Sequence, residues 1–132
     1  MPIHKNSYSK SDRLKSKKSI EDVFKNGKSF YEDPIRLVFK ISTNAAAELK
    51  AGITVPKKKV KLATKRNLVK RRIKEVYRKN NSILKELVHN NELTCHLMLY
   101  YQSNEILLYK DLSPKILLLL QRLQKHIEAK VI

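Results

Sequence analysis

The sequence predicts an α+β fold, a small two-layer sandwich in which helices pack on a sheet, and three observations support this prediction. Apolar residues recur at helical spacing in some segments and alternate with polar residues in others, in the order α-β-β-α-(α)-β-α. Hydrophobic residues make up 42% of the 132 residues, which is enough for a core, and the length indicates one domain over residues 1–132. Two Gly and four Pro are too few for a low-complexity or linker-built protein.

The N-terminal region contains a basic segment and then a short helix. Residues 1–15 are polar and basic, and we expect them to be loose and flexible. A helix is expected over residues 16–27, because Ile20 and Phe24 lie four residues apart on one helical face. Gly27 suits the position just beyond the end of that helix.

Two strands are expected next. Residues 34–42 alternate between apolar and polar side chains, which is typical of a half-buried strand. Residues 49–56 form the second strand, and we expect the two to pair as a hairpin through a turn at 44–48.

The C-terminal half contains helices on either side of one strand. Residues 62–80 and 82–90 have helical periodicity, and residues 93–101 form an apolar run that predicts a central strand. The last helix is expected to begin with Ser113 as its N-cap and Pro114 as its first residue. The connection from the second strand through the first of these helices to the central strand is expected to be a βαβ unit.

The charge of the chain is its most unusual property. Lys and Arg number 29 and Asp and Glu number 12, which gives a net charge of +17. Residues 57–79 hold twelve basic residues and one acid, Glu75, so this stretch carries +11 of that total. Because such an excess opposes compactness by self-repulsion, it predicts a polyanionic partner: nucleic acid first, an anionic membrane surface second. No apolar run reaches the ~18 residues of a membrane span, and the N-terminus has no secretory pattern, so we expect a cytoplasmic protein with no membrane partner.

The basic helix has two different sides. Leu62, Val69 and Ile73 lie on the side that we expect to pack on the sheet, and the cations lie on the opposite side. Arginine can bind phosphate oxygens in a fork, lysine acts as a point charge, and Asn67 can bind a base edge or a 2′-hydroxyl. Three consecutive lysines precede the helix and would add charge at one anion site. The candidate RNA-binding residues are Lys57, Lys58, Lys59, Lys65, Arg66, Asn67, Lys70, Arg71, Lys74 and Arg78.

The sequence predicts no protein catalytic site and no metal site. The four His residues are scattered, and the single Cys95 excludes an internal disulfide and a Cys-based metal site. No Gly-rich phosphate loop or metalloprotease motif occurs. A DNA-binding helix-turn-helix is disfavoured because a strand, not a helix, precedes the basic helix.

Residues 51–59, AGITVPKKK, and 61–78, KLATKRNLVKRRIKEVYR, resemble the signature of the protein component of bacterial ribonuclease P. That signature has a strand that ends in Val-x-Lys-Lys and a helix that carries Arg-Asn-Arg and further cations. Arg66 and Asn67 match the first two residues of the triplet, whereas Leu68 stands where the third is usually Arg, with Arg72 as a candidate to compensate. The resemblance covers about residues 12–127.

The resemblance implies a ribosomal-protein-like α-β sandwich with an unusual left-handed βαβ crossover around the basic helix, an exception to the right-handed rule. It implies an accessory subunit that joins a catalytic RNA and promotes endonucleolytic removal of the 5′ leader from precursor tRNA. Mg²⁺ would be bound chiefly by the RNA subunit, and no obligate protein partner is implied. The alternative is a ribosomal or other structural RNA-binding protein without a catalytic role.

The resemblance also implies that the leader lies in a cleft between the first helix and the sheet. The candidate residues are apolar or aromatic groups at the open face of the sheet: Ile20, Phe24, Leu37 and Phe39. Aromatic rings there can stack on unpaired bases with little sequence preference. The alternative for each of them is a place in the core. Phe39 is the residue that we most expect to face the leader.

Overall fold

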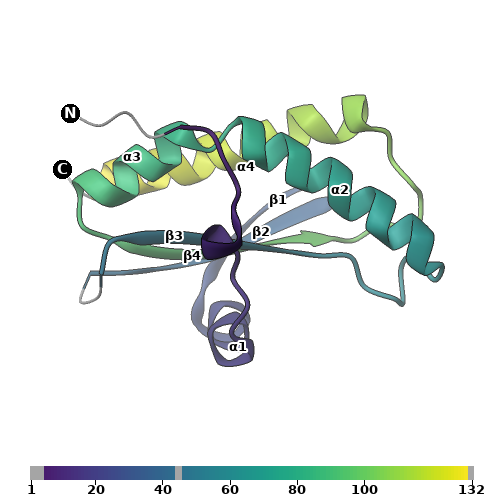
Figure 1. Ribbon diagram of the computed structural model, residues 1–132, viewed down its shortest axis with the longest axis horizontal. Coiled ribbons are helices and arrows are strands. Elements are labelled where there is room, and N and C mark those ends of the chain that lie inside the picture. Colours follow the sequence, from purple (N-terminus) through teal and green to yellow (C-terminus); the bar gives the residue numbers. More distant parts are fainter. Residues whose placement is uncertain (1–4, 44–45, 131–132) are drawn as a thin grey trace.

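The computed structural model describes residues 5–43 and 46–130, and it confirms a mixed α+β fold (Figure 1). Four strands form one sheet in the order β1-β2-β4-β3. Asn44 and Ala45 of the expected turn lie outside the described residues. In chain order the elements are the short 3-10 helix η1 (Lys10–Asp12), α1 (Lys17–Asn26), β1 (Lys28–Glu32), β2 (Ile35–Ser42), β3 (Glu48–Thr54), α2 (Ala63–Lys79), α3 (Ser82–Asn90), β4 (Thr94–Tyr101) and α4 (Tyr109–Lys130).

The hairpin predicted between residues 34–42 and 49–56, which form β2 and β3, is wrong. β2 pairs with β1 and with β4, antiparallel to both, whereas β3 pairs with β4 in parallel. The strand β1 was not expected from the sequence, and it occupies the edge next to β2. β4 lies between β2 and β3, as its long apolar run predicted, because a strand covered on both faces needs apolar side chains on both.

The parallel pairing of β3 with β4 confirms the βαβ connection through α2. The left-handed sense of this crossover stays a prediction from the resemblance. The connection is long because it contains both α2 and α3 before the chain returns to the sheet.

The two faces of the sheet are covered unequally. Helices α2, α3 and α4 lie over one face, and α1 lies alone on the other (Figure 1). Alternation in β2 sends Ile35, Leu37 and Phe39 into the main core beneath the three helices, while Val38 points to the α1 side. The smaller cluster beneath α1 consists of Leu14, Val23, Val38 and Met98, with Ile20 packed against it.

Gly27 lies just beyond α1, as predicted, and the structure shows that a side chain would not fit at this position. A Cβ added there would lie 2.4 Å from the carbonyl oxygen of Val23 and 2.5 Å from that of Phe39. The residue has ordinary extended backbone, with φ of −85°. Glycine therefore lets the end of α1 approach β2 closely.

The last helix begins earlier than predicted. α4 starts at Tyr109, so Pro114 lies inside the helix and Ser113 is not its N-cap. Asp111 and Leu112 both donate their backbone N–H groups to the carbonyl of Leu108, which forms the first turn. The earlier start places Leu112 in the core with no exposed surface, and this burial offsets the helical hydrogen bond that proline cannot donate.

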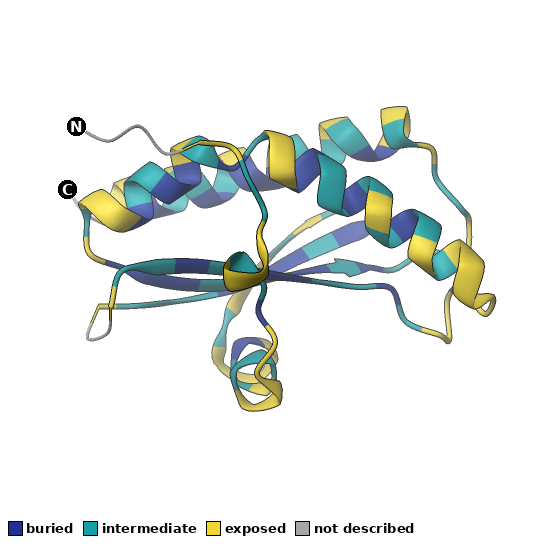
Figure 2. Ribbon diagram, in the orientation of Figure 1, coloured by how far each residue is buried: buried dark blue, intermediate teal, exposed yellow. Residues whose placement is uncertain are grey.

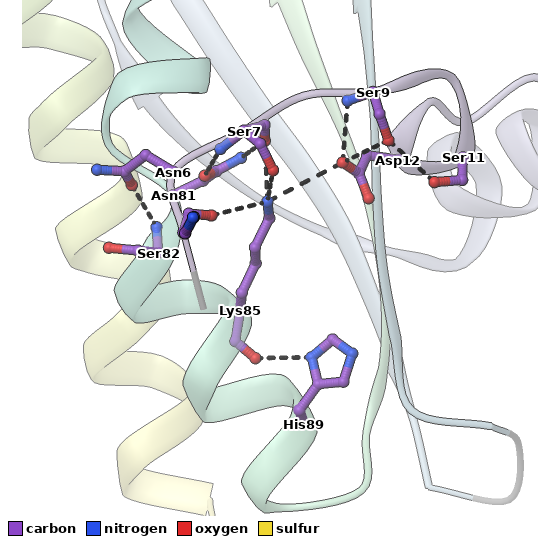
Figure 3. Close-up of polar contacts among 10 residues, drawn as sticks. Asn6, Ser7, Ser9, Ser11, Asp12, Asn81, Ser82, Lys85 and His89 are labelled. Atoms are coloured by element: carbon purple, nitrogen blue, oxygen red, sulfur yellow. Dashed lines mark hydrogen bonds and ion pairs between the residues drawn. The ribbon is translucent and has the colours of Figure 1, made fainter. Parts of the chain in front are cut away.

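Part of the N-terminal segment makes polar contacts with the start of α3, and the expected flexibility of residues 1–15 stays a prediction. Asn81 accepts a hydrogen bond from the Ser7 backbone N–H and donates one to the Ser7 carbonyl. The Lys85 ammonium donates to the Ser7 hydroxyl at 2.6 Å and lies 4.0 Å from Asp12 (Figure 3). Burial lowers the pKa of Lys85, and Asp12 acts in the opposite direction. Asn81, which directly precedes α3, and Lys85 within α3 thus link the N-terminal segment to this helix.

Candidate nucleic-acid interface

The basic helix α2 is anchored to the sheet by its apolar side. Val69, Ile73 and Val76 have no exposed surface, and Tyr77 is 1% exposed. The first turns of α2 are largely exposed, as Figure 2 shows. Burial of one stripe fixes the helix, so the cations on its other side have defined positions relative to the fold.

Several of the predicted RNA-binding residues are free to contact a ligand. On the exposed or half-exposed side of α2, five side chains have no hydrogen-bond or ion-pair partner among the described residues: Lys65, Asn67, Lys70, Arg71 and Lys74. We call this set the basic strip. Lys57, Lys58 and Lys59 are likewise exposed, in the turn that leads to α2. Unpaired cations on a rigid support form a site for a polyanion, because binding does not require an existing ion pair to be broken.

Arg66 is bound to the protein itself. Its guanidinium donates to the backbone carbonyls of Val60 and Lys61, at 3.0 and 2.7 Å. Arg66 therefore braces the lysine-bearing loop against the first turn of α2. The sequence pattern could not show this because it does not place the loop relative to the helix.

Arg78 and Arg72 also have internal partners. Arg78 donates to both carboxylate oxygens of Glu75, at 3.1 and 2.6 Å, and this hydrogen bonding holds the pKa of Glu75 below its ordinary value. Arg72, the candidate to compensate for Leu68, donates to the carbonyl of Leu107 at 2.6 Å. Both arginines thus add positive charge to the surface but are less free than the residues of the basic strip.

The placement expected for two of the leader-cleft residues is wrong. Leu37 has no exposed surface and Phe39 is 2% exposed, and both belong to the main core on the face away from α1. The Phe39 ring packs against the rings of Phe30 and His126, at centroid distances of 5.3 and 5.1 Å. The prediction that Leu37 and Phe39 share one side of β2 is correct. That side faces the layer of three helices, because this layer provides the larger apolar surface.

The other two leader-cleft candidates do lie on the α1 side. Ile20 is half-buried against the smaller cluster, and Phe24 is 43% exposed. The Phe24 ring meets the ring of Tyr100 on β4 edge to face, with centroids 6.0 Å apart. Phe24 thus presents an aromatic surface beside the sheet.

The α1 side of the sheet carries further residues that the sequence analysis missed. The pairing registers place Arg36 opposite Tyr31 on β1 and opposite Tyr100 on β4, so the three form a row across the sheet. The Arg36 guanidinium lies over the Tyr31 ring, 5.5 Å from its centroid. With Phe24 they form what we call the aromatic row. Alternation indicated the side for Arg36, but only the strand registers bring the two tyrosines beside it.

The described residues also bear on whether clustered side chains could hold a metal ion. No group of three or more His, Cys, Asp or Glu side chains in residues 5–43 and 46–130 could hold a metal ion. Cys95 is fully buried, and burial raises the pKa of its thiol to about 12. Within the same ranges, no helix is long and apolar enough to cross a membrane.

Comparison with known proteins decides the family. Residues 8–123 match the family model of ribonuclease P. This chain belongs to the ribonuclease P protein family. Two relatives from Porphyromonas gingivalis strains, both named ribonuclease P protein component, are 34% and 33% identical over 99 residues, which is 74% of this chain and 72% of each relative. The family resemblance noted in the sequence is thus confirmed. Proteins of this family are components of an endoribonuclease complex that also contains RNA, and this chain is one of them.

Solved structures confirm the fold of this ribonuclease P protein. The Staphylococcus aureus RNase P protein superposes with a TM-score of 0.63 at 19% identity, covering 85% of this chain and 94% of that one. The Thermotoga maritima RNase P protein gives 0.65 at 23% identity, covering 83% and 96%. The shared fold places the basic helix on the same kind of sheet scaffold.

Proposed function

We propose that this ribonuclease P protein binds the catalytic RNA subunit and the 5′ leader of precursor tRNA, and thereby promotes endonucleolytic 5′ maturation of tRNA in the cytoplasm. The RNA subunit breaks the phosphodiester bond and holds most of the Mg²⁺. The contribution of the protein is binding and orientation, which lower the cost of bringing two RNA molecules into one productive geometry.

The observation that carries the proposal is the basic strip, five polar or cationic side chains without internal partners on a helix whose opposite side is fully buried. Cations in this arrangement displace the counterions of a folded RNA at several phosphates at once. They need not be freed from carboxylates first, because Glu75, the one acid between residues 57 and 79, is bound by Arg78 and Lys79.

The aromatic row supports the second contact. Phe24, Tyr31 and Tyr100 offer ring surfaces on which unpaired bases can stack without sequence preference, and Arg36 adds a cation for the backbone. A leader is single-stranded and differs in sequence from one precursor to another, so a sequence-tolerant surface suits it. Leader binding is therefore assigned to the aromatic row in place of Leu37 and Phe39.

The test is a cleavage assay in which the full chain is added to a bacterial catalytic RNA at low Mg²⁺. Precursor tRNA with a long leader should be cut at its 5′ end faster with the protein than without it. Phe24→Ala should reduce this gain for a long leader more than for a leader of one nucleotide. Ile83→Ala is the matched control, because Ile83 is an exposed apolar residue of α3, 55% exposed, outside both surfaces.

The outcomes separate the proposal from the alternative. Binding of structured RNA without any gain in cleavage would favour a ribosomal or other structural RNA-binding role. Cleavage by the polypeptide with no RNA subunit present would contradict both.

A further inference from the structure

A hollow of about 550 Å³ opens beside the start of α2, between the lysine-bearing loop and the connection from β4 to α4. Three of the residues that line it are apolar, and we call them its floor. Val60 is buried at 4% exposure, Ile106 is half-buried, and Leu62 is 65% exposed. Leu62 is the most exposed of the large hydrophobic residues that stand out on this surface. An apolar floor at the centre of a strongly basic region is not required by phosphate binding.

The two walls of the hollow are held in place from within the protein. On one side Arg66 binds the carbonyls of Val60 and Lys61. On the other, Arg72 binds the carbonyl of Leu107, whose N–H donates to the Tyr101 hydroxyl. The hollow is thus shaped before any ligand arrives, so that binding costs little ordering.

The rim of the hollow selects for an anion. Four lysines line the hollow, and we call them its rim: Lys58, Lys59, Lys61 and Lys65. No Asp or Glu of the described residues lines it, and the ammonium groups of these lysines have no hydrogen-bond or ion-pair partner in the described part of the chain. Asn104 is the neutral polar side chain on the rim, exposed and likewise unpartnered among those residues. Its amide can donate and accept a hydrogen bond at the same time.

We propose that this hollow receives one unpaired nucleotide of the RNA, with the base on the apolar floor, its edge at Asn104, and the flanking phosphates at the rim lysines. This inference rests on the proposed RNA-binding function and specifies one contact within it. A base has an apolar face, a hydrogen-bonding edge and anionic neighbours, and the hollow offers a complement to each of the three. A duplex would satisfy only the lysines, because its bases are stacked and paired.

The experiment uses the full chain labelled with ¹⁵N and at its methyl groups, titrated by NMR with a uridine hexanucleotide. An abasic oligonucleotide of the same length presents the same phosphates without bases. The methyl signals of Leu62 and Ile106 and the side-chain amide of Asn104 should shift with the first probe and not with the second.

Variants then measure the contribution of the floor and the edge. Leu62→Ala and Asn104→Ala should each weaken hexanucleotide binding about fivefold and leave abasic binding unchanged. Leu118→Ala, at a residue of α4 that is 43% exposed, is the matched control and should change neither. Because Leu62 and Asn104 are exposed, both variants should fold, which circular dichroism checks.

Each remaining outcome contradicts the inference in a different way. Equal losses for both oligonucleotides would make the hollow a site for phosphate alone. Shifts confined to the basic strip would overturn the nucleotide site and leave the proposed function standing. Tighter binding of an acidic amphipathic peptide at Leu62 would make the hollow a protein-docking site. No binding of either oligonucleotide or of structured RNA would overturn the proposed function together with the inference.

Discussion

Removing the three central cations of the basic strip together gives the sharpest test of the RNA surface. Lys70, Arg71 and Lys74 lie outside the buried stripe of α2, and their side chains have no partners among the described residues. Alanine at these positions leaves the core untouched and has the highest helix propensity. The triple variant should therefore keep the fold and lose only positive charge.

The size of the effect follows from counterion release. Each cation–phosphate contact contributes about 0.9 to the slope of log affinity against log salt on a duplex-like RNA, so losing three contacts should lower the slope by about 2.7. At about 0.15 M salt the same relation gives roughly a fivefold loss per contact, and on the order of 100-fold for the triple variant.

Fluorescence anisotropy with a labelled catalytic RNA at several salt concentrations measures both quantities. The matched control replaces Lys110, Lys115 and Lys125 of α4 with alanine, which removes the same net charge from a different surface. A triple strip variant with the slope of the unmodified protein would refute the assignment of this surface. Equal slope losses in the two variants would show that net charge matters, and not the arrangement on α2.

Three further predictions concern the core. Phe39→Ala should lower the free energy of unfolding by about 3–5 kcal/mol in chemical denaturation, since the ring is fully packed; a change below about 1 kcal/mol would contradict its burial. Burial, with Lys130 and Lys28 nearby, lowers the pKa of His126, so the unfolded chain binds its proton more readily. Stability should fall as pH drops below about 6.5, and His126→Leu should reduce that slope. The Cys95 thiol should not react with a thiol reagent until the protein is unfolded by denaturant.

Much of the interface could be predicted because it depends on a single helix. Helical periodicity alone separates Val69 and Ile73 from Lys70 and Lys74, since residues four apart share a side whatever the helix packs against. The charge of residues 57–79 likewise needs no tertiary information. The end of α1 at Gly27 followed from local sequence too, although the close approach to Phe39 that requires glycine was not visible there.

The errors concern relations between elements that are distant in the sequence. The hairpin was expected because consecutive strands often pair, but β4 enters between β2 and β3. The family resemblance led us to place Phe39 at the open face. Alternation could not correct this placement, because it distinguishes two sides of a strand without saying which of them the larger helical layer covers. Arg66 and Arg72 were counted as surface cations because the loops that they bind lie beside them only after folding.

The sequence by itself determined that this protein carries a rigid helix with its cations gathered on one side, because charge and periodicity are local properties of the chain. The tertiary structure decided which of those cations remain free, which face of the sheet stays open beside α1, and that Tyr31, Arg36 and Tyr100 stand in one row. These three features depend on the register of the strands and on which helices cover each face of the sheet. Register and helix placement are in turn determined by the arrangement that buries the most apolar surface, which involves the whole chain.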